Sequence, residues 1–443
     1  MNLRTDKRIL IVFLVIALSP LAGITQQLNQ LKLDSLFTRL EVKNKAMGSI
    51  AISRNGKMIY SRSIGFSSYK EDEKLRANEN TKYRIGSITK IFTATIILQL
   101  IEEGKIDLAT TLESYFPKLP YSNMITISNL LDHTSGIPNI KEIRSKKKAR
   151  THEEMLKIIS SSKNSLLPGE KTSYSNSNYL LLGYIIEKIL NQSYEEVLAN
   201  RILSKIGLRD TYYGHETDTK NNESFPYRLK GSWKQQPVTH PSIPGGSGGI
   251  MSTPTDLIRF IEALFSNKLI SETSLQKMKP ISNDYGMGLV QFEFDTKKAF
   301  GHPGGIDRFE SVVAYFPEDS LAIAYCSNGQ AYPVKDIVIG ALKIYFDKEY
   351  AIPDFTYLGV KPKDLKQYTG AYSSAEIPLR IIISKHKKNL VAQPAGYPSY
   401  KLEAISPVIF MYDEAAVRIE FTRGKNEMKL TQGNKTYHFM KEQ

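Results

Sequence analysis

The sequence of 443 residues contains a single cysteine, Cys326. A disulfide within the chain is therefore excluded, and the apolar residues 321–325 that precede the cysteine predict a buried and inert thiol. There are seven histidines, but none of their spacings is typical of metal ligands. No glycine loop of the kind that cradles a phosphate opens a predicted helix. We therefore expect neither a metal nor a cofactor.

An apolar run long enough to be identified as a membrane span is also lacking. Arg4, Lys7 and Arg8 precede the apolar residues 9–18, and mostly small residues follow at 19–23, which is the pattern of a Sec-type signal peptide. No cysteine follows this run, so a lipid anchor is not expected. We predict that residues 1–25 are a signal peptide, that no stable membrane span remains after cleavage, and that the protein is exported, either periplasmic or secreted.

Acidic residues are fewer than basic ones, 45 against 59, and the formal net charge is +14. A solvated insertion loop is the favoured interpretation of the densest basic cluster. The alternative is a surface that attracts an anionic polymer of the cell envelope, and peptidoglycan is the envelope partner considered. No nucleic-acid-binding motif is present, so no nucleic acid is expected as a partner. The basic cluster consists of Lys141, Arg144, Lys146, Lys147, Lys148 and Arg150.

What the sequence does contain is a serine and a lysine three residues apart, where a loop turns into an apolar helix. Ser87 and Lys90 precede apolar residues at helical spacing from 91 to 101, and Gly104 ends the predicted helix. Residues three apart lie one above the other on a helix, so the amine can reach the hydroxyl. A lysine can activate a serine when burial, neighbouring positive charge or the positive helix end lowers its pKa. The alternative is a capped and solvated helix start, because this spacing also arises by chance.

A second motif, Tyr174 with Asn176, lies in a predicted polar loop at residues 171–178, just before an apolar helix at 179–190. A phenol at this place can relay a proton between a nucleophile and a leaving group. The side-chain amide of Asn176 can bind a substrate amide through both its donor and its acceptor.

A third motif, His302-Pro303-Gly304-Gly305, precedes a predicted strand at residues 311–316. The glycines would let a substrate backbone lie against the strand edge. Pro303 marks that edge as unpaired within its own sheet.

In this order the motifs resemble those of the serine β-lactamase and penicillin-binding-protein superfamily, in its class C-like branch. The signatures Ser-x-x-Lys, Tyr-x-Asn and Lys/His-x-Gly are matched by Ser87/Lys90, Tyr174/Asn176 and His302/Gly304. The resemblance covers roughly residues 36–348. Landmarks at residues 130–136, 248–253 and 285–288 agree with it.

The resemblance implies a role for each of these residues. Ser87 would attack the substrate, and Lys90 and Tyr174 would share the duties of general base and general acid. The backbone N–H groups of Ser87 and Gly305 would form the oxyanion hole. The substrate would be held by Asn176, His302, Gly304 and Gly305.

The third motif departs from the pattern of many class C lactamases, which carry lysine where this chain has His302. Histidine there is more similar to D,D-peptidases, D-aminopeptidases and esterases of the same branch. The following residues are bulkier or more charged than the small residues expected, and Arg308 would bind a substrate carboxylate only if it faces the cleft; otherwise it is a surface residue. These residues are Ile306, Asp307, Arg308 and Phe309.

Two other residues compete for catalytic roles. Ser247 lies in residues 245–249, which fit the nucleophile-elbow pattern Gly-x-Ser-x-Gly, but no strand pattern precedes it. We interpret this segment as a glycine loop that lines or abuts the cleft. His133 has no place beside Ser87 that the sequence establishes, so we favour a structural, hydrogen-bonded histidine.

Periodicity along the chain indicates two domains. Asn55-Gly56 predicts a hairpin, residues 88–270 are mainly helical, strands return at 286–328, and a helix is predicted at 334–350. We predict an α+β, β-lactamase/transpeptidase-like domain at residues 26–350, with an antiparallel sheet flanked by helices and a helical subdomain. Residues 355–443 alternate as short strands, which predicts a small all-β barrel or sandwich that resembles the lipocalin-like C-terminal domains of this branch. The predicted strands are 379–384, 389–393, 400–405, 408–412, 417–422, 428–432 and 436–440.

The expected function is that of an exported serine hydrolase. It would form an acyl-enzyme with amide or ester bonds of a small peptide, β-lactam or ester, and would be β-lactamase-related or D-Ala-D-Ala carboxypeptidase-like. Alternatives are a carboxylesterase of the same fold, a penicillin-binding sensor that acylates without turnover, and a structural envelope protein with a decayed site.

Overall fold

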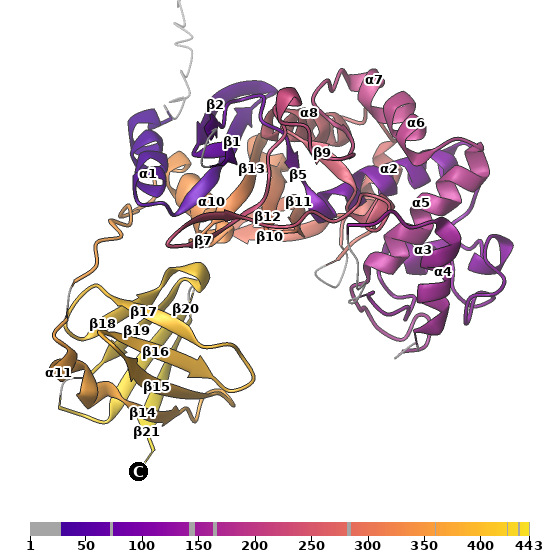
Figure 1. Ribbon diagram of the computed structural model, residues 1–443. Helices are drawn as coiled ribbons and strands as arrows, with labels where there is room; N and C mark the ends of the chain where they lie inside the picture. Colours follow the sequence, from indigo (N-terminus) through magenta and orange to yellow (C-terminus); the bar gives the residue numbers. More distant parts are fainter. Residues whose placement is uncertain are drawn as a thin grey trace, which may run out of the picture.

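The computed structural model describes residues 28–70, 74–140, 147–162, 166–280, 285–358, 360–422, 424–432 and 435–442. The predicted signal peptide lies outside the described residues, as do Lys141, Arg144 and Lys146 of the basic cluster. Figure 1 shows a larger part that holds the main sheet and most helices, and a smaller C-terminal barrel. Across the described ranges, no helix combines the length and the apolar character needed to cross a membrane.

The larger part is built on a six-stranded antiparallel sheet with the strand order β10-β11-β12-β13-β1-β2. The predicted hairpin is confirmed, because Asn55 and Gly56 link β1 and β2 with φ of 51° and 73°, as a two-residue hairpin turn requires. Strands from both ends of this part therefore meet in one sheet. The strands are β1 (Ala46–Arg54), β2 (Lys57–Ile64), β10 (Val290–Phe294), β11 (Lys297–Ile306), β12 (Phe309–Phe316) and β13 (Leu321–Gln330).

Helices cover both faces of this sheet. On β13, Ala322 and Cys326 pack into one core with α8 (Pro254–Phe265), whereas Ile323 packs into another with α1 (Gln30–Val42) and α10 (Val334–Tyr345). The alternation follows from the two-residue period of a strand. Cys326 is fully buried, as predicted, and burial raises the pKa of its thiol.

The predicted end of the last helix at residue 350 is wrong. The helix α10 ends at Tyr345, because Asp347 adopts a left-handed conformation with φ of 51°, which stops helical propagation.

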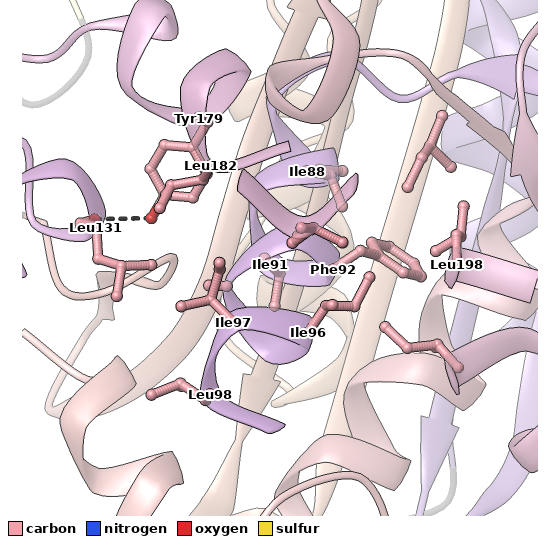
Figure 2. Close-up of a cluster of buried hydrophobic side chains, with 14 of the residues drawn as sticks. Ile88, Ile91, Phe92, Ile96, Ile97, Leu98, Leu131, Tyr179, Leu182 and Leu198 are labelled. Carbon is pink, nitrogen blue, oxygen red and sulfur yellow. Dashed lines mark hydrogen bonds between the residues drawn. The ribbon is translucent and has the colours of Figure 1, made fainter. Parts of the chain in front are cut away.

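The helical region packs around α2, which contributes an unbroken run of buried residues from Thr89 to Leu100. In Figure 2, side chains of α2 meet Leu131 of α3, Tyr179 and Leu182 of α5, and Leu198 of α6. Tyr179 also donates a hydrogen bond of 2.7 Å to the carbonyl oxygen of Leu131. A central helix that is apolar nearly all round is typical of a core position. The helices are α2 (Thr89–Glu102), α3 (Ile127–Leu131), α4 (His152–Ser161), α5 (Asn176–Leu190), α6 (Tyr194–Leu198), α7 (Ser204–Ile206) and α9 (Glu272–Met278).

Three small sheets complete this part of the chain. Their orders are β3-β4, β5-β9-β6 and β7-β8. Their strands are β3 (Phe66–Tyr69), β4 (Lys74–Arg76), β5 (Tyr83–Arg84), β6 (Tyr212–Tyr213), β7 (Tyr227–Lys230), β8 (Ser232–Gln235) and β9 (Ile250–Ser252).

The C-terminal part is a closed eight-stranded barrel, preceded by α11 (Pro362–Leu365). Each strand predicted in this region is present, and β14 is an additional strand that the sequence reading missed. The barrel encloses its own apolar core. Its strands are β14 (Gly370–Ser373), β15 (Arg380–His386), β16 (Asn389–Pro394), β17 (Tyr400–Ala404), β18 (Ile409–Tyr412), β19 (Val417–Phe421), β20 (Glu427–Gln432) and β21 (Lys435–Lys441).

Candidate active site

Ser87 lies in a single 3-10 turn, Gly86–Ile88, that leads directly into α2. Gly86 has φ of 51°, which favours glycine, and a Cβ there would lie 2.8 Å from the backbone nitrogen of Gly305. The turn therefore lies against β11, at the junction between the sheet and the helical region. The helix was predicted from the apolar pattern, whereas a place for Ser87 near Gly305 was implied by the family resemblance.

Two side chains converge on the Ser87 hydroxyl. Lys90 Nζ lies 3.1 Å from Ser87 Oγ, and Tyr174 Oη lies 2.7 Å from the same oxygen. Lys90 also donates to Asn176 Oδ1 at 2.7 Å and to the carbonyl oxygen of Ser247 at 2.8 Å. Lys90 from the same helix start, and Tyr174 and Asn176 from a distant segment, thus share one hydrogen-bonded group with the serine.

Burial sets the protonation of this group. Lys90 has no exposed surface, and burial holds the pKa of its amine well below the ordinary value of 10.5. Burial raises the pKa of Tyr174, although its hydrogen bond with Ser87 opposes this. Burial therefore favours the neutral amine of Lys90 and the protonated phenol of Tyr174. That combination provides one group that accepts a proton and one that donates a proton beside the same hydroxyl.

His302 and the two glycines lie on the part of β11 that forms the edge of the sheet. The strand β10 pairs with β11 only as far as Gly301, so among the described strands none pairs with residues 302–306 on that side. This agrees with the unpaired edge predicted from Pro303. A Cβ at Gly304 would meet the carbonyl oxygen of Ile85 at 2.0 Å, whereas a Cβ at the exposed Gly305 would meet nothing within 4 Å.

His302 is buried and uncharged at neutral pH, because burial and the nearby Lys90 lower its pKa from 6.5 to about 3. Its Nδ1 lies 2.5 Å from the carbonyl oxygen of Pro303 and must carry the proton, which leaves Nε2 as a hydrogen-bond acceptor. Its ring centroid is 6.4 Å from that of Tyr174. His302 therefore provides a neutral polar group beside the Tyr174 phenol.

A cavity of about 260 Å³ opens beside Ser87. Predicted residues in its wall are Ser87, Asn176, Ser247 and Gly305. The remainder of the wall is largely apolar and comes from both the helical region and the sheet. It comprises Gly86, Ile140, Met155, Ser177, Leu180, Thr239, Ile243, Pro244, Gly248, Ile306 and Asp307.

Three predictions made for neighbouring residues can be checked. Asn176 opens the helix α5, so the predicted polar loop ends at Ser175; the alternation of polar residues there concealed the first helical turn. The loop of Ser247 lines the cavity, as predicted, but the Ser247 hydroxyl donates a hydrogen bond of 2.6 Å to the carbonyl oxygen of Pro244. Arg308 is exposed on the β11–β12 turn and is absent from the cavity wall, so it is a surface residue.

His133 is buried and hydrogen-bonded, as predicted. Its Nδ1 accepts from the backbone N–H of Ser175 at 3.2 Å, and its ring lies 4.5 Å from that of Tyr174. Burial lowers its pKa well below the ordinary value. It therefore orients the segment that carries Tyr174.

The sequence reading missed Asn139. Its Oδ1 accepts from the backbone N–H and the side-chain Nδ2 of Asn176, at 3.2 and 3.1 Å. This orients the Asn176 amide so that its oxygen faces Lys90. The only signal was its position soon after the landmark at residues 130–136. In the part of the chain that the structure describes, no group of three or more metal-ligating side chains comes together.

The Beta-lactamase family model matches residues 34–343. PbpX of Bacillus subtilis strain 168 is 32% identical over 248 residues, which are 54% of this chain and 61% of PbpX, so the match spans less than two thirds of that relative. Penicillin-binding protein 4* of the same strain is 24% identical over 436 residues, 90% of this chain and 94% of that protein.

Among solved structures, the D-amino acid amidase from Ochrobactrum anthropi SV3, complexed with L-phenylalanine amide, matches with a TM-score of 0.63 and 25% identity. The match covers 71% of this chain and 99% of the amidase. The residues matched by the family model include every predicted site residue from Ser87 to Gly305 and leave out the barrel.

Proposed function

The chain belongs to the Beta-lactamase family, whose members are generally serine hydrolases, and on this premise we propose that it forms an acyl-enzyme at Ser87. The observation that carries the proposal is the convergence of Lys90 Nζ and Tyr174 Oη on Ser87 Oγ, at 3.1 and 2.7 Å. A serine with a neutral amine and a protonated phenol in hydrogen-bond reach has the base and the acid that acyl transfer requires.

In the first step, the hydroxyl proton of Ser87 passes to the neutral amine of Lys90, and Oγ forms a bond with the substrate carbonyl carbon. The carbonyl oxygen gains the negative charge and is stabilised by the backbone N–H groups of Ser87 and Gly305. Support for this oxyanion hole comes from the close packing of Gly86 against Gly305, which brings the two backbone segments together.

In the second step, the bond from the carbonyl carbon to the leaving nitrogen or oxygen breaks. Tyr174 gives its proton to the leaving atom and recovers one from the Lys90 ammonium. Water then attacks the carbonyl carbon of the acyl-enzyme and gives its proton to Lys90. The bond from that carbon to Ser87 Oγ breaks, Tyr174 gives Oγ its proton, and the acid is released. General acid–base catalysis of this kind contributes about 10² to 10⁴-fold in rate.

The proposed substrates are amides and esters, with β-lactams and small peptides as the first classes to test. Asn176 and the uncharged His302 offer polar contacts without a fixed positive charge, which suits a neutral scissile group. Export through residues 1–25 also remains our proposal from the sequence, and the N-terminal mass of the native protein checks it.

The experiment compares adduct formation in three variants with a fluorescent penicillin or a phosphonate probe. Ser87→Ala and Lys90→Ala are each expected to eliminate the adduct, because a nucleophile and its base act as a unit. Ser247→Ala is the matched control and keeps the label, since its hydroxyl bonds within its own loop. Labelling that persists in Ser87→Ala and disappears in Ser247→Ala would overturn the mechanism.

A substrate panel on the same proteins separates the alternatives. Turnover of short acyl nitrophenyl esters without turnover of D-Ala-D-Ala peptides would identify a carboxylesterase. A stable adduct without hydrolysis would identify a sensor.

A further inference from the structure

Asp307 is the single charged residue among the described residues that line the cavity beside Ser87. We propose that it determines specificity by binding a positively charged group, such as an ammonium, on the acyl side of the scissile bond. The inference rests on the proposed function, because it assigns a substrate class to the same site.

The position of the cavity places Asp307 on the acyl side. Ser87 and Gly305 line the cavity, whereas Tyr174 and His302 do not. Tyr174 is the proposed donor to the leaving group and lies beside His302, so the leaving group is expected near the middle of β11. Asp307 comes two residues after Gly305, in the turn that follows β11, on the side away from His302. The acyl part of the substrate therefore extends toward Asp307.

The Asp307 carboxylate is fixed in place but keeps free acceptor capacity. Its Oδ2 accepts from the backbone N–H of Thr239 and its Oδ1 from the Thr239 hydroxyl, both at 2.6 Å. A carboxylate has about four acceptor positions, so two remain for a ligand. The residue is only half-buried, and its φ of 51° is held by the tight β11–β12 turn.

No lysine, arginine or histidine within the described ranges forms an ion pair with Asp307. The negative charge of Asp307 acts on the buried Arg84 guanidinium and partly offsets the lowering of its pKa by burial. Arg84 nevertheless donates its hydrogen bonds to the carbonyl oxygens of Thr239 and His215, at 2.9 and 3.0 Å. In a chain of net charge +14, a carboxylate without an ion pair in a catalytic cavity favours a cationic ligand.

The rest of the cavity wall defines the remaining part of the substrate. Met155, Leu180 and Ile243 present apolar side chains. A suitable acyl group therefore carries an ammonium near the carbonyl and an apolar side chain, as in an amide or ester of an apolar amino acid with a free amino group.

Three penicillins provide a matched test. Ampicillin carries an ammonium on the α carbon of its side chain, where benzylpenicillin carries hydrogen and carbenicillin a carboxylate. Rates of Ser87 acylation are measured by intact mass, so no turnover is needed. The proteins are the wild type, Asp307→Asn, Asp307→Ser as a second neutral variant, and the control Glu310→Gln, which removes an exposed charge outside the cavity wall.

We expect the wild type to react with ampicillin about 10- to 100-fold faster than with benzylpenicillin, and slowest with carbenicillin. Both Asp307 variants are expected to bring the ampicillin to benzylpenicillin ratio close to one, and Glu310→Gln to leave it unchanged.

Several results would overturn the inference while leaving the proposed function intact. They are a wild type without charge preference, a preference for carbenicillin, or variants that slow all three penicillins equally, which would indicate a purely structural role. Absence of any adduct on Ser87 with all three compounds would overturn the proposed function, and the inference with it.

Discussion

At the scale of single residues, burial and uncharged neighbours together favour the neutral amine of Lys90. Its amine has no exposed surface, and among the described residues its hydrogen-bond partners are the uncharged Ser87, Asn176 and Ser247 carbonyl. A carboxylate beside the amine would stabilise the ammonium form. The absence of an ion pair on Lys90 among the described residues therefore keeps the amine available to accept a proton.

His302 allows a pH prediction with a defined range. Its pKa is about 3 in the folded protein and 6.5 as the ordinary value, so between these pH values the unfolded chain binds a proton that the folded protein does not. Stability from this residue is therefore present above pH 6.5 and is lost as the pH falls toward 3, by up to about 1.4 kcal/mol per pH unit.

Replacing His302 by glutamine should remove this contribution to the change of unfolding free energy with pH. Urea unfolding at several pH values between 4 and 6.5 measures it, with the exposed barrel residue His386→Gln as the control. Equal slopes in wild type and His302→Gln would contradict the buried, uncharged state of His302.

At the scale of elements, the site depends on how closely β11 approaches the turn of Ser87. A Cβ at Gly304 would lie 2.0 Å from the carbonyl oxygen of Ile85 and 2.3 Å from Ser311 Oγ, and the carbonyl belongs to the residue just before the turn. Because backbone must move to accommodate it, Gly304→Ala is expected to cost about 1–3 kcal/mol of unfolding free energy and to slow acylation.

Gly305→Ala is the matched control for this prediction, since nothing lies within 4 Å of a Cβ there. Its unfolding free energy should stay within about 0.5 kcal/mol of the wild type. Denaturant unfolding of both variants tests the difference. An equal loss of unfolding free energy in both variants would show that the close approach of β11 to the Ser87 turn is not the cause of the destabilisation.

Elements whose signal is local were predictable from the sequence. The apolar repeat predicted α2, and Asn55-Gly56 predicted the β1–β2 turn. The place of Tyr174 beside Ser87 and Lys90 had no local signal and was implied by the family resemblance. The strand β14 was missed because its four residues, which include Gly370 and Ala371, show little alternation.

Contacts between distant segments were not predictable in the same way. The hydrogen bonds from Asn176 to Asn139 and from Lys90 to the Ser247 carbonyl depend on how loops meet in the fold. No local pattern encodes such a pairing, and an asparagine or a backbone carbonyl carries no distinctive signature.

At the scale of the whole molecule, the barrel contacts the larger part through a buried ion pair. Lys45 Nζ lies 2.6 Å from Asp413 Oδ2, and both side chains are about nine-tenths buried. Tyr357, from the connecting segment, donates a hydrogen bond to the same carboxylate, and the Lys45 amine lies over the rings of Phe355 and Tyr357. The connecting segment therefore takes part in packing rather than serving as a free linker.

Phe355 bears on the predicted start of the second domain at residue 355, a boundary that stays a prediction. Its side chain is buried in the core formed by α1, α10 and the sheet, with its ring 5.0 Å from that of Tyr332. Leu358, by contrast, is half exposed, and its backbone N–H donates to Ala404 of the barrel. A truncation that leaves the core of the larger part intact should therefore end after Leu358.

Two truncated chains test this division. A chain ending at residue 358 keeps Phe355 and all residues of the cavity wall, so it should stay soluble and acylate Ser87 at a rate close to that of the full chain. A chain ending at residue 354 loses the buried ring of Phe355 and should be less stable by about 3–5 kcal/mol, as for a large core truncation. Denaturant unfolding and labelling with a fluorescent penicillin are measured on both. If the chain ending at 358 aggregates or does not react while the full chain does, the barrel is required for the larger part to fold. If both truncated chains are equally stable, Phe355 does not anchor the connecting segment.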